Sequence, residues 1–188
     1  MGEARLDSST FMLPPVVDSA SRLSRHFGWY ALKVRTGAEL STAAALRYRG
    51  FEPYCPTQKE RRRYSDRMKL VEAAIFSGYV FCQFDVQYKL PIISSPGVEY
   101  IVGFAHGPTP VPEAEIVSIR RVIDAGASAT LYLARGQRVR VMRGPLQGIE
   151  GILVRDETGD RLVVSIELVN QSASLRIDHD EICPVRHD

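Results

Sequence analysis

The residues best suited to chemistry in this sequence are basic and aromatic side chains in its first half. Between residues 59 and 69, six Lys or Arg residues stand against only Glu60 and Asp66, although the whole chain has a net charge of +2. Such a local excess of positive charge is either a solvated loop or a surface that faces an anion such as nucleic acid. The candidate phosphate contacts are Arg61, Arg62, Arg63, Arg67 and Lys69, with Lys33 and Arg35 on an earlier strand.

The most β-prone stretch of the chain runs from residue 75 to residue 84. Phe76, Cys82 and Phe84 share one parity, while Tyr79 and Phe81 share the other. Because successive side chains of a strand point to opposite faces, both faces of this strand should be apolar. One face can be covered by a core, so the other needs a second layer or a partner. The surplus of aromatic residues therefore predicts an apolar docking patch.

Catalytic chemistry is not indicated. The four histidines are dispersed, and the polar run 178–181 alternates between the two faces of a strand, so it cannot present its ligands together. No phosphate-binding glycine loop and no nucleophile motif occurs. Cys55, Cys82 and Cys183 form no CxxC pair, which argues against a zinc site or a disulfide framework. We predict a binding protein, not an enzyme, without catalytic residues, metal or cofactor.

The composition is that of an ordinary folded soluble protein. Of 188 residues, 45% are hydrophobic and 24% are charged. No apolar run approaches the roughly 20 residues of a membrane span. The first 21 residues have an acid at Glu3 and no continuous apolar region, unlike a signal peptide. We therefore expect a cytoplasmic monomer that does not contact a membrane.

The order of the patterns predicts two domains of the α+β class. Residues 1–27 resemble a flexible tail, 28–123 a mixed or antiparallel sheet covered by helices, 124–133 a small polar linker, and 134–188 a small β-barrel. A capping box at Thr36 and Glu39 predicts a helix over 37–49, and Pro112 predicts the start of another. The expected strands are 29–35, 51–55, 58–64, 68–73, 78–84 and 98–102, with a short helix over 86–94 and a loop over 103–112.

The second half contains a stretch that resembles the KOW motif. Its characteristic residues are Gly136, Val139, Val141, Gly144, Pro145, Gly148 and Gly151. In the first half, Trp29-Tyr30, the stretch 75–81, Pro96-Gly97-Val98 and Pro110-Val111-Pro112 resemble the N-terminal (NGN) domain of NusG in the same order. Together, residues 28–185 resemble a NusG-type transcription elongation and antitermination factor, whose fold is an NGN domain followed by an SH3-like KOW barrel.

This resemblance implies that the NGN-like domain binds the clamp of RNA polymerase and suppresses pausing or termination. The apolar depression that docks on the clamp would use Phe76, Tyr79, Phe81 and Phe104. Lys33 and Arg35 match positions that face upstream DNA, so DNA, nascent RNA or both are further expected partners. The stretch 63–69 resembles the specialised UpxY, LoaP and RfaH-like paralogs, which implies antitermination on particular operons, for example those for polysaccharide synthesis.

In the barrel, the resemblance implies docking on Rho or on a ribosomal protein through an aromatic residue between the third and fourth strands. Leu168-Val169-Asn170-Gln171 stands there instead, which argues against these partners. The period-2 pattern predicts a stable barrel, although some relatives refold this domain into helices. The alternative function is a KOW-type RNA-binding or ribosome-associated protein. Polymerase docking predicts an open concave patch of Phe76, Tyr79, Phe81 and Phe104, and burial of these rings inside the core of the sheet would contradict it.

Overall fold

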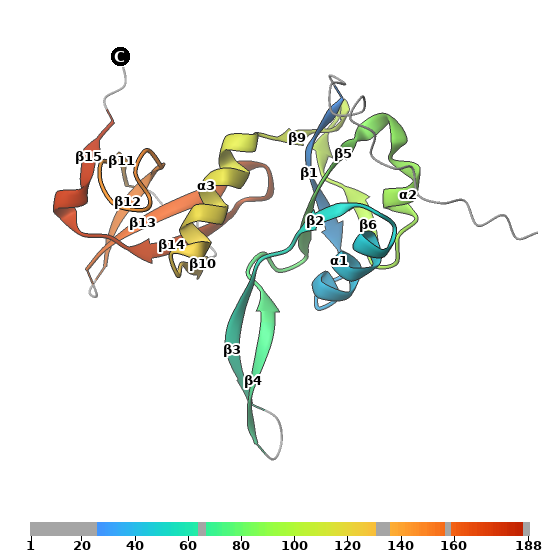
Figure 1. Ribbon diagram of the computed structural model, residues 1–188, viewed down its shortest axis with the longest axis horizontal. Coiled ribbons are helices and arrows are strands. Elements are labelled where there is room, and N and C mark those ends of the chain that lie inside the picture. The colour runs from blue at the N-terminus through green and yellow to red at the C-terminus, as the bar shows by residue number, and fades with distance from the viewer. Residues whose placement is uncertain (1–25, 64–66, 131–135, 157–158, 186–188) are drawn as a thin grey trace, which may run out of the picture.

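The computed structural model describes residues 26–63, 67–130, 136–156 and 159–185. The chain forms a helix-covered sheet and a small all-β unit, with one helix standing between them and a long hairpin projecting from the first (Figure 1). The tail predicted over 1–27 lies almost wholly outside the described residues. The predicted α+β class, a helix-covered sheet followed by a small β-barrel, is confirmed. No helix in the described ranges is long and apolar enough to cross a bilayer.

The first sheet is antiparallel. Its strand order is β2 (Glu52–Tyr54), β5 (Tyr79–Asp85), β1 (Phe27–Val34) and β6 (Val98–Ile101), and β9 (Pro110–Val111) also pairs with β1. Helices α1 (Glu39–Tyr48) and α2 (Leu90–Ile93), with the 3-10 turn η2 (Val86–Tyr88), belong to the same body. One face of the sheet packs with α1 and α2 into a closed core: Tyr30, Leu32, Val34, Ala43, Leu46, Phe51, Val80, Cys82, Phe84 and Ile92.

Helix α1 begins two residues later than the capping box predicts. Ala38 occupies the N-cap position and makes no side-chain cap. The buried carboxylate of Glu39 instead accepts hydrogen bonds from the backbone N–H groups of Gly37 (3.1 Å) and Gly78 (2.7 Å). Burying a carboxylate costs free energy unless its oxygens accept hydrogen bonds. The two hydrogen bonds to Glu39 therefore take the place of the capping box predicted at Thr36. Glu39 thereby fixes the turn that leads into β5.

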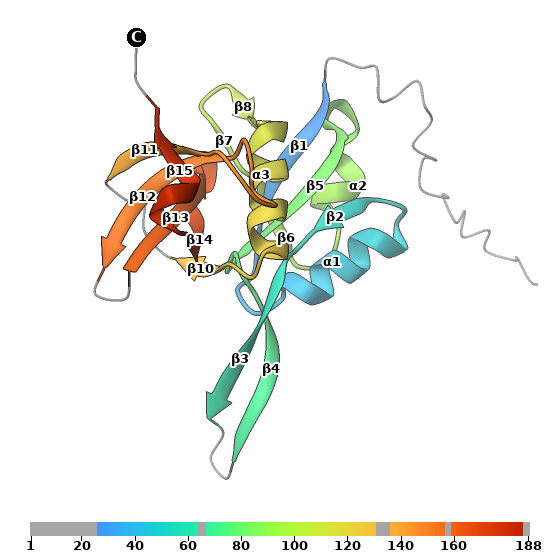
Figure 2. The same ribbon diagram turned by 60° about the vertical axis from the view of Figure 1, so that its left-hand side comes forward.

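The basic segment forms the predicted hairpin, with β3 at Thr57–Arg63 and β4 at Met68–Ala74. The two strands pair only with each other and extend away from the rest of the molecule (Figures 1 and 2). The prediction of a loop over 103–112 is only partly correct, because three short strands form there: β7 (Gly103–Phe104), β8 (Gly107–Pro108) and β9. Strand β9 completes the ladder of β1 beyond the end of β6.

The second sheet has the strand order β10 (Ser128–Thr130), β14 (Gln171–Arg176), β13 (Gly159–Ile166), β12 (Glu150–Asp156), β11 (Gln137–Val141) and β15 (Ile182–Pro184). Short 3-10 turns, η3 (Glu167–Val169) and η4 (His179–Glu181), connect its later strands. Its buried residues include Val139, Leu162 and Ile166. The residues predicted as linker, 124–133, include β10, since the backbone of Ser128–Thr130 pairs with the otherwise open edge of β14. The domain boundaries stay a prediction.

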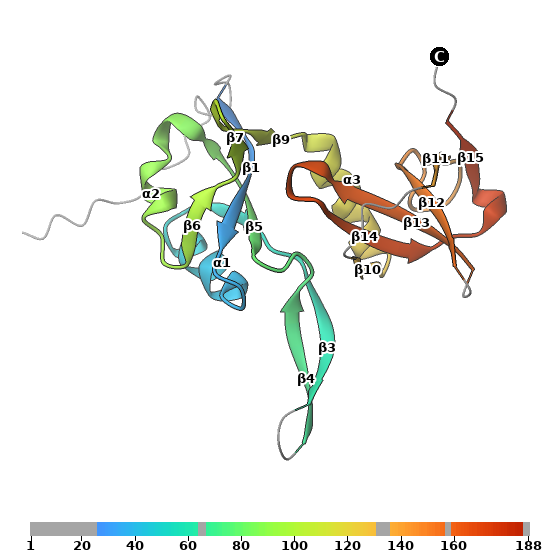
Figure 3. The ribbon, with the colours of Figure 1, turned by 180° about the vertical axis from the view of Figure 1, so that it is seen from behind.

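Helix α3 (Glu113–Asp124) follows Pro112, as the sequence predicts. Ile116, Ile119 and Val122 are buried on one helical face. Seen from the front and from behind, α3 stands between the first sheet and the barrel (Figures 1 and 3). It packs against β1 on one side and against β13 and β14 on the other. The two bodies therefore share a hydrophobic layer built around this helix.

The three cysteines are free and differ in accessibility: Cys82 is buried, Cys55 is half-buried and Cys183 is exposed. Burial raises the pKa of Cys82 to about 12 and that of Cys55 to about 11, so both thiols stay protonated at neutral pH and up to about pH 10. Because the thiolate is the reactive form, iodoacetamide at pH 8 should label Cys183 alone in the folded protein. Mass spectrometry of Cys183→Ser would then find no rapid labelling, and rapid labelling of that variant would contradict the prediction.

Candidate docking surface

The second face of the first sheet carries the aromatic residues. Ala31 of β1 lies opposite Phe81 of β5, and both belong to a cluster that includes Trp29, Phe76 and Val111. The Phe76 and Phe81 rings meet edge to face, with centroids 5.4 Å apart. Their parity in the sequence differs, but Gly78 has a φ of +78°, and this turn resets the direction of the chain before β5. Phe76 therefore lies on the Phe81 face and not with Cys82.

This aromatic face is covered by helix α3 and the barrel. The Arg120 guanidinium of α3 lies 4.8 Å from the centre of the Trp29 ring and 4.6 Å from that of Tyr54. Phe81 has no exposed surface, and its cluster continues through α3 into the barrel core. The expectation of an open concave patch is wrong for this arrangement of the chain. The rings are covered by a second layer and are not buried in the core beneath α1 and α2.

Polar contacts bind α3 to the barrel. The Nη2 of Arg121 donates to the carbonyl oxygens of Pro145 (2.6 Å) and Gln147 (3.0 Å). The Glu115 carboxylate accepts from the backbone N–H of Glu167 (3.3 Å). Burial raises the pKa of Glu115, and the nearby Glu167 carboxylate raises it further, while the N–H bond opposes both. Two consecutive arginines of α3 thus make contacts on opposite sides: Arg120 stacks on aromatic rings of the sheet, and Arg121 donates hydrogen bonds to the barrel.

The first residue of β14 contacts the turn that leads into β5 of the first sheet. The Gln171 side-chain amide donates to the carbonyl oxygen of Ser77 at 3.2 Å, in the turn that precedes Tyr79. Val169 is buried, Leu168 packs against the shared cluster, and Asn170 adopts the left-handed conformation with φ of 51°. This is the stretch in which the resemblance expected an aromatic residue. In this chain, it lies against the chain's own aromatic face.

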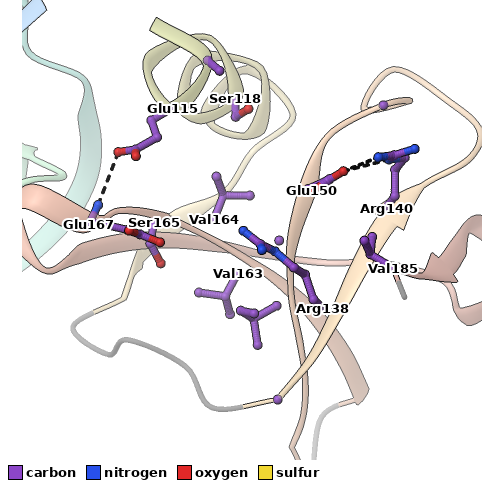
Figure 4. Close-up of a pocket in the computed structure, with 15 residues that line it drawn as sticks. Glu115, Ser118, Arg138, Arg140, Glu150, Val163, Val164, Ser165, Glu167 and Val185 are labelled. Atoms are coloured by element: carbon purple, nitrogen blue, oxygen red, sulfur yellow. Dashed lines mark hydrogen bonds and ion pairs between the residues drawn. The ribbon is translucent and has the colours of Figure 1, made fainter. Parts of the chain in front are cut away.

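A groove of about 1000 Å³ separates α3 from the outer surface of the barrel (Figure 4). Glu115 and Ser118 line its helical side, and Arg138, Arg140 and Glu150 line the barrel side. Arg140 and Glu150 form an ion pair, in which the Nε of Arg140 donates to the Glu150 carboxylate at 2.9 Å. The charged lining of the groove combines three acids, Glu115, Glu150 and Glu167, with two bases, Arg138 and Arg140. This balance does not favour a ligand of either charge.

The four residues predicted to bind polymerase are only partly brought together. Phe76, Phe81 and the half-buried Tyr79 share one cluster, whereas Phe104 lies on β7, is 71% exposed and is not a member of it. Lys33 Nζ lies 4.6 Å from the centre of the Tyr79 ring. The margin at Lys33 and Tyr79 is thus one part of the aromatic face that solvent reaches.

Arg120 and Tyr54 are contact residues that the sequence analysis missed. Tyr54 is half-buried between α3 and Phe81, and burial raises the pKa of its hydroxyl. The alternation of β2 could have placed Tyr54 on a face. Arg120 stands four residues after Ile116 and three before Ile123, so the helical spacing could have placed it, and not Arg121, beside the apolar stripe of α3.

The predicted basic residues lie on two elements. Lys33 and Arg35 stand at the end of β1, where the backbone N–H of Arg35 donates to Gly97 (3.1 Å). The others belong to the hairpin, where the following side chains are exposed: Lys59, Arg61, Arg63, Arg67 and Lys69. The side chain of Arg62 lies outside the described part of the structure.

The KOW-like stretch forms a strand, a tight turn and a second strand. Val139 and Val141 point into the barrel core, and Gly144 and Gly148 have positive φ values. A Cβ atom on Gly151 would lie 2.6 Å from the carbonyl oxygen of Val163, so only glycine fits without a shift of the backbone. Pro145 supplies a carbonyl to Arg121, as described above. No group of three or more potential metal ligands occurs in the described ranges.

Comparison with known proteins agrees with this architecture. The family model of the transcription termination factor NusG matches residues 27–120, half of the chain. The chain is 24% identical to the transcription termination/antitermination protein NusG of Campylobacter jejuni, over 82% of this chain and 95% of that one. It is 27% identical to the protein of the same name from Lactococcus lactis, over 82% and 91%.

Two solved structures also resemble the chain. NusG of Thermotoga maritima is 19% identical, with 85% of this chain and 98% of that chain covered and a TM-score of 0.48. The MjSpt4:Spt5 complex is 16% identical, with 85% and 99% covered and a TM-score of 0.30. Neither structural likeness is close enough to carry an argument about function.

The family model and the two relatives define this protein as a factor that acts in transcription. The chain belongs to the NusG family, which confirms the resemblance found in the sequence. It is a transcription termination/antitermination factor of that family, and family membership agrees with the prediction that it is not an enzyme.

Proposed function

We propose that this protein binds the clamp of RNA polymerase through the aromatic face of its first sheet and thereby suppresses pausing and termination. The observation that supports this is the sheet's second apolar face. The sheet already has a closed core beneath α1 and α2, yet Trp29, Tyr54 and Phe81 form a further apolar surface on the opposite side. An apolar surface beyond the needs of its own core is typical of a docking site.

Docking through this face requires that α3, the barrel or both move away from it, because Phe76 and Phe81 are covered. The apparent affinity for polymerase would then equal the intrinsic affinity of the uncovered form multiplied by the fraction of molecules that are uncovered. Such a factor acts by differential binding. It stabilises the moving polymerase over the paused one and needs no chemistry of its own.

An operon-specific role within the family is supported by the resemblance of the stretch 63–69 to the specialised paralogs, and its basic residues point to nucleic acid. The hairpin carries Arg61, Arg63 and Arg67 on an exposed element, which fits contacts to DNA or to nascent RNA in the elongation complex. Lys33 and Arg35 supply positive charge next to the aromatic face. The stretch 168–171 lacks an aromatic residue and is occupied by an internal contact, so coupling to Rho or to a ribosomal protein is not favoured.

The experiment that tests polymerase docking compares two tyrosines. Tyr79→Ala removes a half-buried ring of the aromatic face, and we expect the affinity for RNA polymerase to fall about tenfold or more, as for a hot-spot residue. Tyr48→Ala, on the opposite side of the sheet and 87% exposed, should change it less than twofold. Biolayer interferometry with immobilised polymerase measures both, and circular dichroism checks that both variants are folded.

Equal affinities of Tyr79→Ala and Tyr48→Ala would remove the aromatic face from the docking surface. A wild-type chain that fails to bind polymerase but co-sediments with ribosomes would favour the alternative of a ribosome-associated protein. Phe104→Ala is a separate test, because Phe104 lies outside the cluster. A loss of affinity there would extend the surface to the β7–β8 hairpin.

A further inference from the structure

The two faces of the β3–β4 hairpin differ in charge and in accessibility. The register pairs Lys59 with Glu72, Arg61 with Leu70 and Arg63 with Met68. Because directly opposed residues of an antiparallel pair point to the same side, these six side chains form one face, which we call the outer face. All six are exposed: Lys59, Arg61, Arg63, Met68, Leu70 and Glu72.

The opposite face is more protected. Ala73 is buried, Gln58, Glu60 and Val71 are half-buried, and the Gln58 amide donates to the Glu60 carboxylate at 3.0 Å. Among the described side chains of this face, Lys69 is the exposed cation. The strand alternation therefore divides the positive charge that the sequence shows as one run: Lys59, Arg61 and Arg63 are on the outer face, and the register pairs Arg62 with Lys69.

Apolar side chains lie directly across from the two arginines of the outer face. Met68 is 60% exposed and Leu70 is 56% exposed. A hairpin that was only a solvated loop would gain nothing from exposing these two side chains opposite Arg63 and Arg61. On the outer face the cations line β3 and the apolar side chains line β4. This arrangement matches a nucleic-acid groove, where phosphates line the edge, and base edges with thymine methyl groups form the floor.

We propose that the outer face of this hairpin binds in the groove of double-stranded DNA. In this arrangement Lys59, Arg61 and Arg63 contact phosphates while Leu70 and Met68 contact the bases or sugars. The inference rests on the nucleic-acid role proposed above for the basic residues, and it adds the form of nucleic acid and the face that binds it.

The dimensions of the hairpin favour the DNA duplex. The major groove of B-DNA is about 12 Å wide and admits a two-stranded β-ribbon. Strands of seven residues reach about 20 Å at roughly 3.3 Å per residue, enough to enter a groove about 8.5 Å deep. Strands β3 and β4 contain no aromatic residue on which single-stranded bases could stack. The deep, narrow major groove of an RNA duplex excludes such a ribbon.

The test measures the binding of the full chain to a fluorescein-labelled DNA duplex of about 25 base pairs by anisotropy, at several salt concentrations. We expect Arg61→Gln and Arg63→Gln each to weaken binding about three- to tenfold and to reduce the salt slope by about 0.9, the value for one phosphate contact. The sequence alone placed Lys69 among the candidate phosphate contacts, but the register puts it on the opposite face, so Lys69 is not among the proposed contacts. Lys69→Gln, a matched loss of charge, should therefore change the affinity less than twofold. Leu70→Asn should weaken binding without changing the salt slope.

Equal losses for Arg61→Gln and Lys69→Gln would overturn the assignment to one face. Tighter binding to the single strand of the same sequence, or to an RNA duplex, would overturn the assignment to double-stranded DNA, as would the absence of duplex binding by the wild type. Polymerase affinity measured on the same proteins separates this inference from the docking proposal. Arg61→Gln should leave it unchanged, and Tyr79→Ala should lower it while duplex binding persists.

Discussion

Replacing Phe81 with alanine is expected to lower the free energy of unfolding by about 3–5 kcal/mol, the usual cost of a Phe→Ala change in a protein core. Phe81 has no exposed surface and contacts the ring of Phe76 edge to face. Its ring also lies 6.4 Å from that of Tyr54, which in turn stacks with Arg120 of α3. The substitution would therefore leave a cavity where the sheet, its covering helix and the shared cluster meet.

Phe104→Ala is the matched control, because the same residue type is 71% exposed on β7. Its cost should lie within about 0.5 kcal/mol, as for most surface substitutions. Urea denaturation followed by tryptophan fluorescence measures both variants, and Trp29 lies in the same cluster as Phe81. Equal stabilities of the two variants would mean that the aromatic face is not packed as described.

The second large effect concerns the layer that covers the aromatic face. Arg120→Gln removes a guanidinium that stacks on both Trp29 and Tyr54. Exposed cation–π contacts contribute about 0.5–1 kcal/mol each, so their combined loss would weaken the covered arrangement by about 1–2 kcal/mol. If most molecules are covered, the apparent affinity for polymerase should rise roughly 5- to 30-fold. Biolayer interferometry measures this gain, which is opposite in sign to the effect of Tyr79→Ala.

Arg121→Gln is the control for this prediction, since Arg121 bonds the barrel carbonyls of Pro145 and Gln147 instead of the sheet. Helix α3 packs more extensively on β13 and β14 of the barrel than on β1 of the first sheet, so we expect α3 to stay with the barrel when the face is uncovered. Arg121→Gln should then leave the polymerase affinity within about twofold. A gain for Arg121→Gln and none for Arg120→Gln would mean that α3 stays on the sheet.

The sequence was sufficient for the elements whose patterns are local. Alternation predicted both faces of β5, and Pro112 predicted the start of α3. Turn glycines and the KOW-like stretch predicted the barrel. These features depend on neighbours along the chain, and a residue's parity or helical phase is fixed by the backbone alone.

The missed features depend on residues far apart in the chain. Glu39 was assigned to a capping box because Thr36 precedes it by three residues, but its carboxylate bonds Gly78. The face on which the Phe76 side chain lies could not be predicted by alternation from β5, because the turn at Gly78 stands between them. The aromatic face is covered through contacts of Arg120 and Gln171 and by the barrel. The packing of the barrel on the sheet produces no periodic pattern in the sequence.

The short connections at both ends of α3 limit how the two bodies can separate. One residue, Pro112, stands between β9, which is paired with β1, and the first residue of α3. Three residues stand between the end of α3 and β10, which is paired with β14, a reach of about 10 Å. While these pairings hold, the barrel can only pivot about an end of the helix. Its effective concentration near the aromatic face stays high, so re-covering is an intramolecular event that does not depend on protein concentration.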